Sequence, residues 1–253
     1  MVTAAEILSE LMAEGSEAQA AQLRRFFKCG PGEYGEGDRF LGLKNPQTRA
    51  IVRLVRREVP LAEIEKLLYS EWHEARLFGF LLLVEEMKAA LPKKRDLPVW
   101  GAERREELAT FYLKHARQAN NWDLGDLSCP KILGEWLVYP GSDGELPSTD
   151  ILDRLAGSGN LWEQRITIVT TWRLIRDGRF DETLRLARCF LSHPHDLIHK
   201  ATGWMLREVG KKNEEVLVAF LEENYARMPR TALRYAIERM SEPDRQYWLT
   251  RKS

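Results

Sequence analysis

The chain has 253 residues, of which 44% are hydrophobic and 30% charged, and its 38 basic side chains balance 38 acidic ones. This length can bury a large core, and the longest apolar run, residues 77–84, is far too short to span a membrane. A net charge of zero does not favour a nucleic-acid-binding protein. A neutral chain can still carry a basic stripe when its acidic residues lie on another face.

The N-terminus and the cysteines indicate a cytoplasmic protein. Residues 1–6 lack the basic segment and following apolar stretch that mark a secretory signal. Cys29, Cys129 and Cys189 are widely spaced and odd in number, which fits buried thiols in a reducing compartment better than a disulfide framework. We therefore expect a cytoplasmic protein without a membrane segment.

Helical periodicity dominates the chain from end to end. Apolar residues recur at spacings of three and four, and neither Asn-Gly hairpins nor runs of alternating β-branched residues occur. The pattern predicts helices over residues 4–14, 16–29, 46–58, 61–70, 72–89, 102–119, 122–137, 148–156, 161–177, 181–192, 195–211, 214–228, 229–240 and 243–251. Pro46, Pro229 and Pro243 fit first turns, where the missing amide has no partner to lose.

The predicted helices also recur as pairs. Arg76, Arg165 and Lys200 each stand near a helix start and are followed four positions later by a large apolar residue. The 35-residue step from Arg165 to Lys200 is typical of solenoids built from helix pairs. We therefore predict an all-α solenoid that forms a single domain over residues 1–253, with a concave face suited to a long ligand.

Residues 30–38, with the sequence GPGEYGEGD, interrupt the helical pattern. Their four glycines indicate a tightly turned or mobile loop. A phosphate-binding loop is not indicated, because no strand precedes the segment and no GKS or GKT follows it. Two interpretations remain: the loop covers or borders a functional surface, or it is a plain connector.

The stretch Asn120–Asp126, NNWDLGD, is the best candidate for chemistry. Asn120 or Asn121 is a suitable N-cap, so a helix is expected to begin at Trp122. Trp122 and Asp126 are then i and i+4 neighbours on one helix face. An indole beside a carboxylate suits a cationic partner or a reaction whose transition state becomes cationic. The structural alternative is a core tryptophan beside an acid that the helix dipole favours.

Other candidate sites are weaker. His193, His195 and His199 are clustered, but no cysteine lies nearby and no HExxH glutamate is present, so capping and surface roles are favoured over a zinc site. Several basic residues near helix starts fit either a track of phosphate contacts or a solvated helix face. They are Arg76, Arg165, Lys200, Arg230 and Arg234.

Several segments, taken together and in this order, resemble the AlkD-type DNA glycosylases, HEAT-like-repeat proteins that remove alkylated bases. They are Phe40–Leu43 (FLGL) with Pro46–Arg49 (PQTR), Asn121–Asp126 (NWDLGD), Leu161–Arg165 (LWEQR) and Lys200–Glu208 (KATGWMLRE). The similarity runs from about residue 20 to about residue 240, and the last block is the most specific. It implies an all-α, HEAT-like superhelix that binds double-stranded DNA containing alkylated bases.

The resemblance also implies roles for individual residues. Asp126 would be the catalytic carboxylate, and Trp122 and Trp204 would be aromatic walls beside the deoxyribose of the damaged nucleotide. Arg165 would hold a backbone phosphate near the lesion. Further DNA contacts are expected from Lys200, Arg207, Phe26, Arg76 and Arg230.

The family acts on cationic N3- and N7-alkylpurines and is thought to do so without base flipping. Such a base leaves as a neutral molecule, so a carboxylate and two indole faces need only stabilise the oxocarbenium-like sugar. We expect a monomeric, monofunctional glycosylase without a metal or organic cofactor. The nearest lysine to the Trp122–Asp126 pair is Lys131, which leaves a Schiff-base step without an obvious nucleophile.

Two positions depart from the family pattern. Phe26 stands where the family has a tyrosine on the second helix, and Asp196–Leu197 stands where it has a Phe-Phe pair before the Lys200 block. Two alternative functions remain at this stage: a non-catalytic HEAT-repeat protein that binds distorted or branched DNA, and a protein–protein adaptor. A salt-sensitive affinity for duplex DNA would exclude the adaptor.

Overall fold

The computed structural model describes residues 2–93 and 97–251. Over these residues the chain is helical, and the only extended pairing is an isolated bridge between Arg39 and Trp72. The prediction of an all-α protein is confirmed. The chain divides into two compact units, residues 1–146 and 147–253, while the single-domain assignment stays a prediction. Among the described helices, none is long and apolar enough to cross a membrane.

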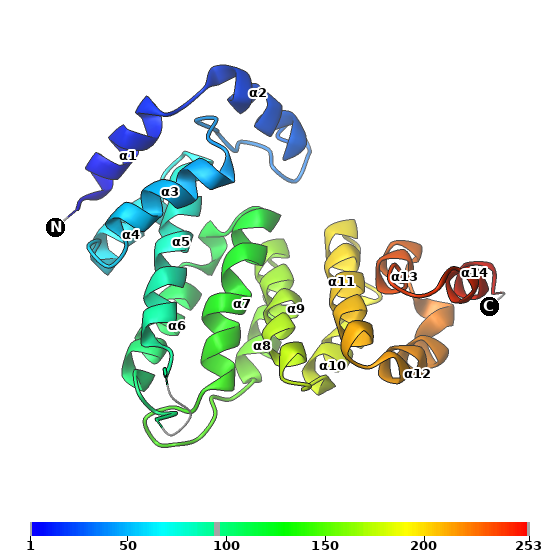
Figure 1. Cartoon of the computed structure of the whole chain (residues 1–253). Coiled ribbons are helices and arrows are strands. Elements are labelled where there is room, and N and C mark those ends of the chain that lie inside the picture. Colours follow the sequence, from blue (N-terminus) through cyan, green and yellow to red (C-terminus); the bar gives the residue numbers. More distant parts are fainter. Residues whose placement is uncertain (1, 94–96, 252–253) are drawn as a thin grey trace. The chain divides into compact units, whose positions relative to one another are not determined.

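The first unit is built around its longest helix, α5 (His73–Ala90). This helix packs against α4, α6 and α7, and it is buried on nearly all sides because residues 77–84 are almost uniformly apolar. The helices of this unit are shown in Figure 1. They are α1 (Ala4–Ala13), α2 (Glu17–Phe26), α3 (Asn45–Val55), α4 (Leu61–Leu68), α5, α6 (Ala102–Lys114) and α7 (Trp122–Val138), with a 3-10 turn over Ala116–Gln118.

The second unit is built around α11 (Asp196–Lys212), which packs against the helices on either side of it in sequence. Its closest neighbour is α13, because a Cβ on Gly203 would lie 2.4 Å from the carbonyl oxygen of Ala232. The glycine of the KATGW block is therefore a packing residue. The other helices are α8 (Asp150–Ala156), α9 (Leu161–Arg176), α10 (Asp181–Phe190), α12 (Glu214–Asn224), α13 (Arg230–Ala236) and α14 (Glu242–Thr250), with a 3-10 turn over Tyr225–Arg227.

All fourteen predicted helices are present among the described residues. Consecutive helices pack as the pairs α4–α5, α6–α7, α8–α9 and α10–α11, as the repeat predicts. The predictions over 102–119 and 214–228 are too long, because the final turn of each tightens into a 3-10 turn. The helix predicted over 229–240 ends at Ala236. The three cysteines, which all lie among the described residues, form no disulfide, but the prediction of buried thiols holds only for Cys129, since Cys29 is half-buried and Cys189 exposed.

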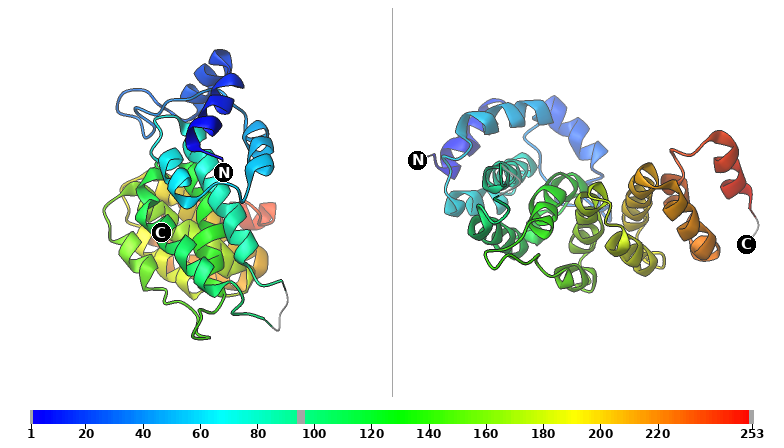
Figure 2. Two further views of the ribbon diagram at one scale, coloured as in Figure 1. Left: turned by 90° about the vertical axis from the view of Figure 1, so that its left-hand side faces the viewer. Right: turned by 60° about the horizontal axis from the view of Figure 1, so that its bottom comes forward.

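The connection between α2 and α3 is an irregular segment beside the helices, shown in Figure 2. Its last part is held by Glu74 near the start of α5. The buried Glu74 carboxylate accepts hydrogen bonds from the backbone amides of Leu41, Gly42 and Leu43, at 2.9, 2.8 and 3.1 Å. The FLGL segment is therefore an anchor for the loop.

Gly42 gives a testable consequence of this anchor. Its φ is +92°, and an added Cβ would lie 2.0 Å from the carbonyl oxygen of Ser16. A non-glycine residue at such a φ costs about 1–3 kcal/mol, and at Gly42 the clash with the backbone of Ser16 adds to this cost, so Gly42→Ala is expected to lower the melting temperature more than Gly144→Ala. Gly144→Ala is the matched control, because its φ is +86° with no atom within 4 Å of the added Cβ. Equal melting temperatures for the two variants would contradict this explanation.

Candidate active site

Trp122 and Asp126 lie on one face near the start of α7, as the sequence predicts. Asn121 is the N-cap, and its side-chain oxygen accepts a hydrogen bond from the Trp122 amide at 2.9 Å. Both Trp122 and Asp126 are half-buried, so the indole and the carboxylate are partly accessible from outside. The two groups thus form one patch that is both aromatic and acidic.

Aromatic side chains of the α2 end and the following loop surround Trp122. The ring centroids of Phe26 and Phe27 lie 5.8 and 5.3 Å from that of Trp122, and Phe26 is 62% exposed. The indole N–H donates a hydrogen bond to the hydroxyl of Tyr34 at 3.3 Å. Tyr34 belongs to the glycine-rich loop, so this loop borders the candidate site. It also brings a hydroxyl to the indole that Phe26 cannot supply.

A cluster of charged side chains is buried behind Trp122. The His73 ring lies between two carboxylates: Nδ1 is 2.7 Å from an oxygen of Asp38, and Nε2 is 2.9 Å from an oxygen of Asp123. Arg76 also pairs with Asp38, and the Asn121 amide donates to Asp38 at 3.3 Å. His73, Arg76 and Asp38 are buried, and the side chain of Asp123 is only 12% exposed.

Electrostatics make His73 an imidazolium at neutral pH. Burial alone would lower its pKa, but the attraction of Asp123 and hydrogen bonds to both Asp123 and Asp38 raise the pKa to about 9. Burial would likewise raise the pKa of Asp38, yet bonds and charges from His73 and Arg76 bring it below its usual value. Two cations thus balance two carboxylates inside the protein.

Aromatic rings complete the surroundings of this imidazolium. Phe40 stacks on the His73 ring with a centroid separation of 4.5 Å, and Phe27 lies 5.0 Å from it on a tilted plane. Such contacts stabilise a cation. Phe27 touches both His73 and Trp122, so it links the buried cluster to the indole. A cavity of about 320 Å³ opens among these rings between α2, α5 and α7.

Sequence reasoning missed this cluster. His73 is 35 residues from Asp38 and 50 residues from Asp123, so no local spacing indicates the contacts. Asp123 lies inside the NNWD motif, where nothing in the local sequence indicates a contact with a histidine 50 residues away. The only sequence signal was a histidine at the start of the most apolar helix.

Arg76 is a correction to the predicted DNA contacts. Its side chain is only 5% exposed and forms an ion pair with Asp38, and it also donates to the carbonyl of Ser70 at 2.8 Å. A guanidinium committed to a buried carboxylate is a poor ligand for a DNA phosphate, because leaving Asp38 unpaired would be costly. The structure therefore gives Arg76 a structural role.

Other predicted site residues belong to the second unit. Arg165 on α9 is 7% exposed and donates to the carbonyl of Leu197 at 2.5 Å, which ties α9 to the first turn of α11. Lys200 on α11 forms an ion pair with Asp196 at 3.0 Å, and its side chain is 40% exposed. Trp204 follows Gly203 on the same helix and is half-buried.

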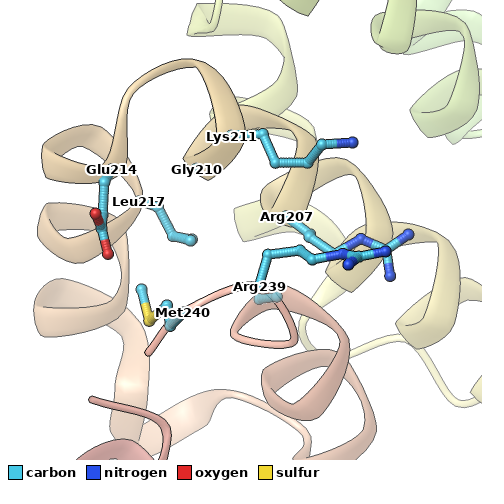
Figure 3. Close-up of a pocket in the computed structure, with 8 residues that line it drawn as sticks. Arg207, Gly210, Lys211, Glu214, Leu217, Arg239 and Met240 are labelled. Atoms are coloured by element: carbon cyan, nitrogen blue, oxygen red, sulfur yellow. The ribbon is translucent and has the colours of Figure 1, made fainter. Parts of the chain in front are cut away.

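Arg207 lies on the wall of a small hollow in the second unit, shown in Figure 3. Lys211 and Arg239 line the same hollow, and Arg207 also pairs with Glu238. The hollow, about 80 Å³, has room for a few water molecules but not for a nucleotide. Arg230 donates to the carbonyl of Leu249 at 2.9 Å and thereby ties α13 to α14.

The histidine cluster serves as a helix cap. Nδ1 of His195 accepts from the amide of Leu197 at 3.1 Å, and Nδ1 of His193 accepts from the amide of His195 at 3.0 Å. His193 Nε2 also lies 3.0 Å from the side-chain oxygen of Gln164. In the part of the chain that the structure describes, no group of three or more His, Cys, Asp or Glu side chains could hold a metal ion.

Comparisons with known proteins agree with this fold. A solved structure described as a predicted DNA alkylation repair enzyme from Enterococcus faecalis superposes with a TM-score of 0.64 at 18% identity, over 90% of this chain and 97% of that one. A comparison with curated proteins finds no match. A sequence model of the family described as DNA alkylation repair enzymes matches residues 7–240, which is nearly the whole chain. The chain therefore belongs to the family of DNA alkylation repair enzymes.

Proposed function

We propose that this protein is a monofunctional DNA glycosylase that excises cationic N3- and N7-alkylated purines from duplex DNA. The observation that carries the proposal is the patch formed by Trp122 and Asp126, an accessible indole and carboxylate on one face of α7. This patch is suited to a sugar that becomes positively charged, because both groups attract a cation.

The chemistry follows from the charge of the substrate. An alkylated purine is already cationic, so cleavage of the glycosidic bond releases a neutral base and leaves the positive charge on the sugar. The Asp126 carboxylate would stabilise that charge and orient the water that attacks C1′, which loses its proton to the carboxylate or to solvent, and the indole face of Trp122 would add a cation–π contribution. A general acid is unnecessary, since the leaving base needs no proton.

Residues outside this patch are proposed to hold the DNA. Phe26 is exposed beside Trp122, and Trp204 on α11 of the second unit is a further proposed aromatic contact with the DNA. Lys200 and the half-buried Arg207 each pair with an exposed carboxylate, and ion pairs of this kind are weak enough for a phosphate to replace the carboxylate. Arg165 and Arg230 complete the proposed phosphate contacts. Arg76 is left out of this set because its guanidinium is paired with the buried carboxylate of Asp38.

The test is release of free base by the wild-type protein. Duplex DNA methylated to contain 7-methylguanine and 3-methyladenine would be incubated with the protein, and free bases counted against spontaneous depurination. Duplex affinity at several salt concentrations would be measured in parallel, because phosphate contacts make binding fall steeply with salt. Tight, salt-sensitive binding without release of base would contradict the glycosylase proposal and would favour a non-catalytic protein that binds distorted DNA. No salt-sensitive binding would favour a protein adaptor.

The hydrogen bond from Trp122 to Tyr34 gives a further prediction. Tyr34→Phe removes the acceptor of the indole N–H, and the loss of one such bond is worth about 1 kcal/mol. We expect single-turnover base release to slow by about fivefold, with the same duplex affinity. Tyr69→Phe is the matched control, because the Tyr69 side chain is 59% exposed and its ring packs on His115. Equal rates for the two variants would show that Tyr34 does not matter for release.

A further inference from the structure

The two residues on either side of Trp122, Asn121 and Asp123, form hydrogen bonds with a buried pair of side chains, Asp38 and His73. The Asn121 amide donates to Asp38 at 3.3 Å, and the Asp123 carboxylate binds the other side of the His73 ring at 2.9 Å. Asp38 and His73 are themselves joined at 2.7 Å. The backbone of the first turn of α7 is therefore held at two points, one before the indole and one after it.

The indole itself is held by contacts from outside α7. Phe27 packs between His73 and Trp122, and Tyr34 accepts the indole N–H. The side chain of Trp122 is thus confined by the same loop that supplies Asp38. These contacts hold the indole through its N–H and through its ring, while the i, i+4 spacing places Trp122 on the same helix face as Asp126.

From this geometry we infer that Asp38 and His73, acting through Asp123 and Asn121, are positioning residues that set the orientation of Trp122 for the proposed reaction. The inference rests on the proposed function, because it concerns the residue that would face the sugar. Neither residue is proposed to touch the DNA.

Burial of the charges supports a positioning role over a purely stabilising one. Taking ions out of water is costly, and a well-packed apolar cluster of similar volume is often as stable as a buried ion pair. Apolar contacts, however, have no fixed direction, whereas hydrogen bonds to an imidazolium fix both distance and angle. Supporting residues of this kind are worth most where a reacting group must be held in a single geometry.

The test removes one at a time the two hydrogen bonds that join the start of α7 to Asp38 and His73. Asp123→Ala removes the link from α7 to His73 but leaves the Asp38–His73 pair intact, whereas Asp123→Asn keeps an oxygen that can accept from His73 Nε2. Misplacement of a reacting group costs up to about 10²-fold, so single-turnover release of 7-methylguanine is expected to fall by about 10- to 100-fold in Asp123→Ala and to recover largely in Asp123→Asn. Duplex affinity should not change.

A second variant keeps the test decisive if Asp123→Ala is unstable. Asn121→Ser retains a side-chain oxygen for the N-cap but removes the amide that donates to Asp38. It is expected to slow release in the same way. Asp181→Ala, an exposed acid in the first turn of α10, is the matched control and should behave as wild type.

A spectroscopic measurement separates positioning from activity. With 5-fluorotryptophan in the full chain, the Trp122 resonance is assigned from its loss in Trp122→Phe. One narrow signal is expected in wild type and Asp123→Asn, and a broadened or shifted signal in Asp123→Ala and Asn121→Ser. Unchanged signals and rates in folded Asp123→Ala and Asn121→Ser would overturn the inference. A mobile Trp122 in the variants, with no base release by wild type, would instead overturn the proposed function alone.

Discussion

Asp126→Asn is expected to slow release of alkylated purines by roughly 10²- to 10³-fold, the usual cost of removing a group that stabilises transition-state charge. The change preserves the size of the side chain and removes its negative charge. Asp126 lies in the second turn of α7, and the helix start is capped by the side chain of Asn121. The effect should therefore fall on the chemical step, which single-turnover kinetics measure directly.

Duplex binding and a variant of a second acidic residue provide the controls for this experiment. Asp126→Asn should bind duplex DNA at least as tightly as wild type, because removing an acid near phosphates reduces repulsion. Asp150→Asn, an exposed acid at the start of α8, should keep the wild-type rate. A rate for Asp126→Asn within a few fold of wild type would assign the carboxylate a structural role and remove the proposed mechanism.

The stability of the protein is expected to fall as pH rises from about 6.5 to about 9. The pKa of His73 is raised from 6.5 to about 9 in the folded protein. The stability that the protonated ring contributes is therefore fully present below its unfolded pKa and is lost as the pH rises through its folded pKa. A shift of this size corresponds to about 3 kcal/mol. Above pH 9 the neutral ring no longer compensates Asp38 and Asp123. Urea unfolding at pH 6.5 and pH 9.5 measures the difference.

Variants of two histidines test whether His73 is the source of the stability lost between pH 6.5 and pH 9.5. His73→Gln removes the titrating ring, so its unfolding free energy should be lower than that of wild type at pH 6.5 and should change less up to pH 9.5. His199→Gln, in the second unit, is the control and should keep the full wild-type loss. If wild type and His73→Gln lose equal stability over this range, the buried imidazolium does not stabilise the fold.

The helices were predictable because each depends on local signals. The start of α7 at Trp122 follows from Asn121, which can cap a helix whatever lies around it. α5 follows from an apolar run that lies inside a longer stretch of helical pattern, which together predict a buried helix. Helix ends were less accurate, as at Ala236, because the final turn depends on the packing of the next segment.

The candidate site was predictable only where its residues are neighbours in sequence. Trp122 and Asp126 share one helix, so their common face follows from helical spacing. The contacts of His73 with Asp38 and Asp123 come from segments far apart in sequence, and only the packed fold brings them together. The prediction that Arg76 contacts DNA has the same origin, because the sequence around a basic residue near a helix start does not show whether a distant carboxylate pairs with it inside the fold.

The most direct test of the proposed function is single-turnover release of 7-methylguanine from methylated duplex DNA, with wild type and Asp126→Asn side by side and duplex affinity measured on the same samples. We predict that wild type releases the base and that Asp126→Asn binds the duplex but releases almost none. Tight binding by wild type with no release above spontaneous depurination would contradict the glycosylase proposal.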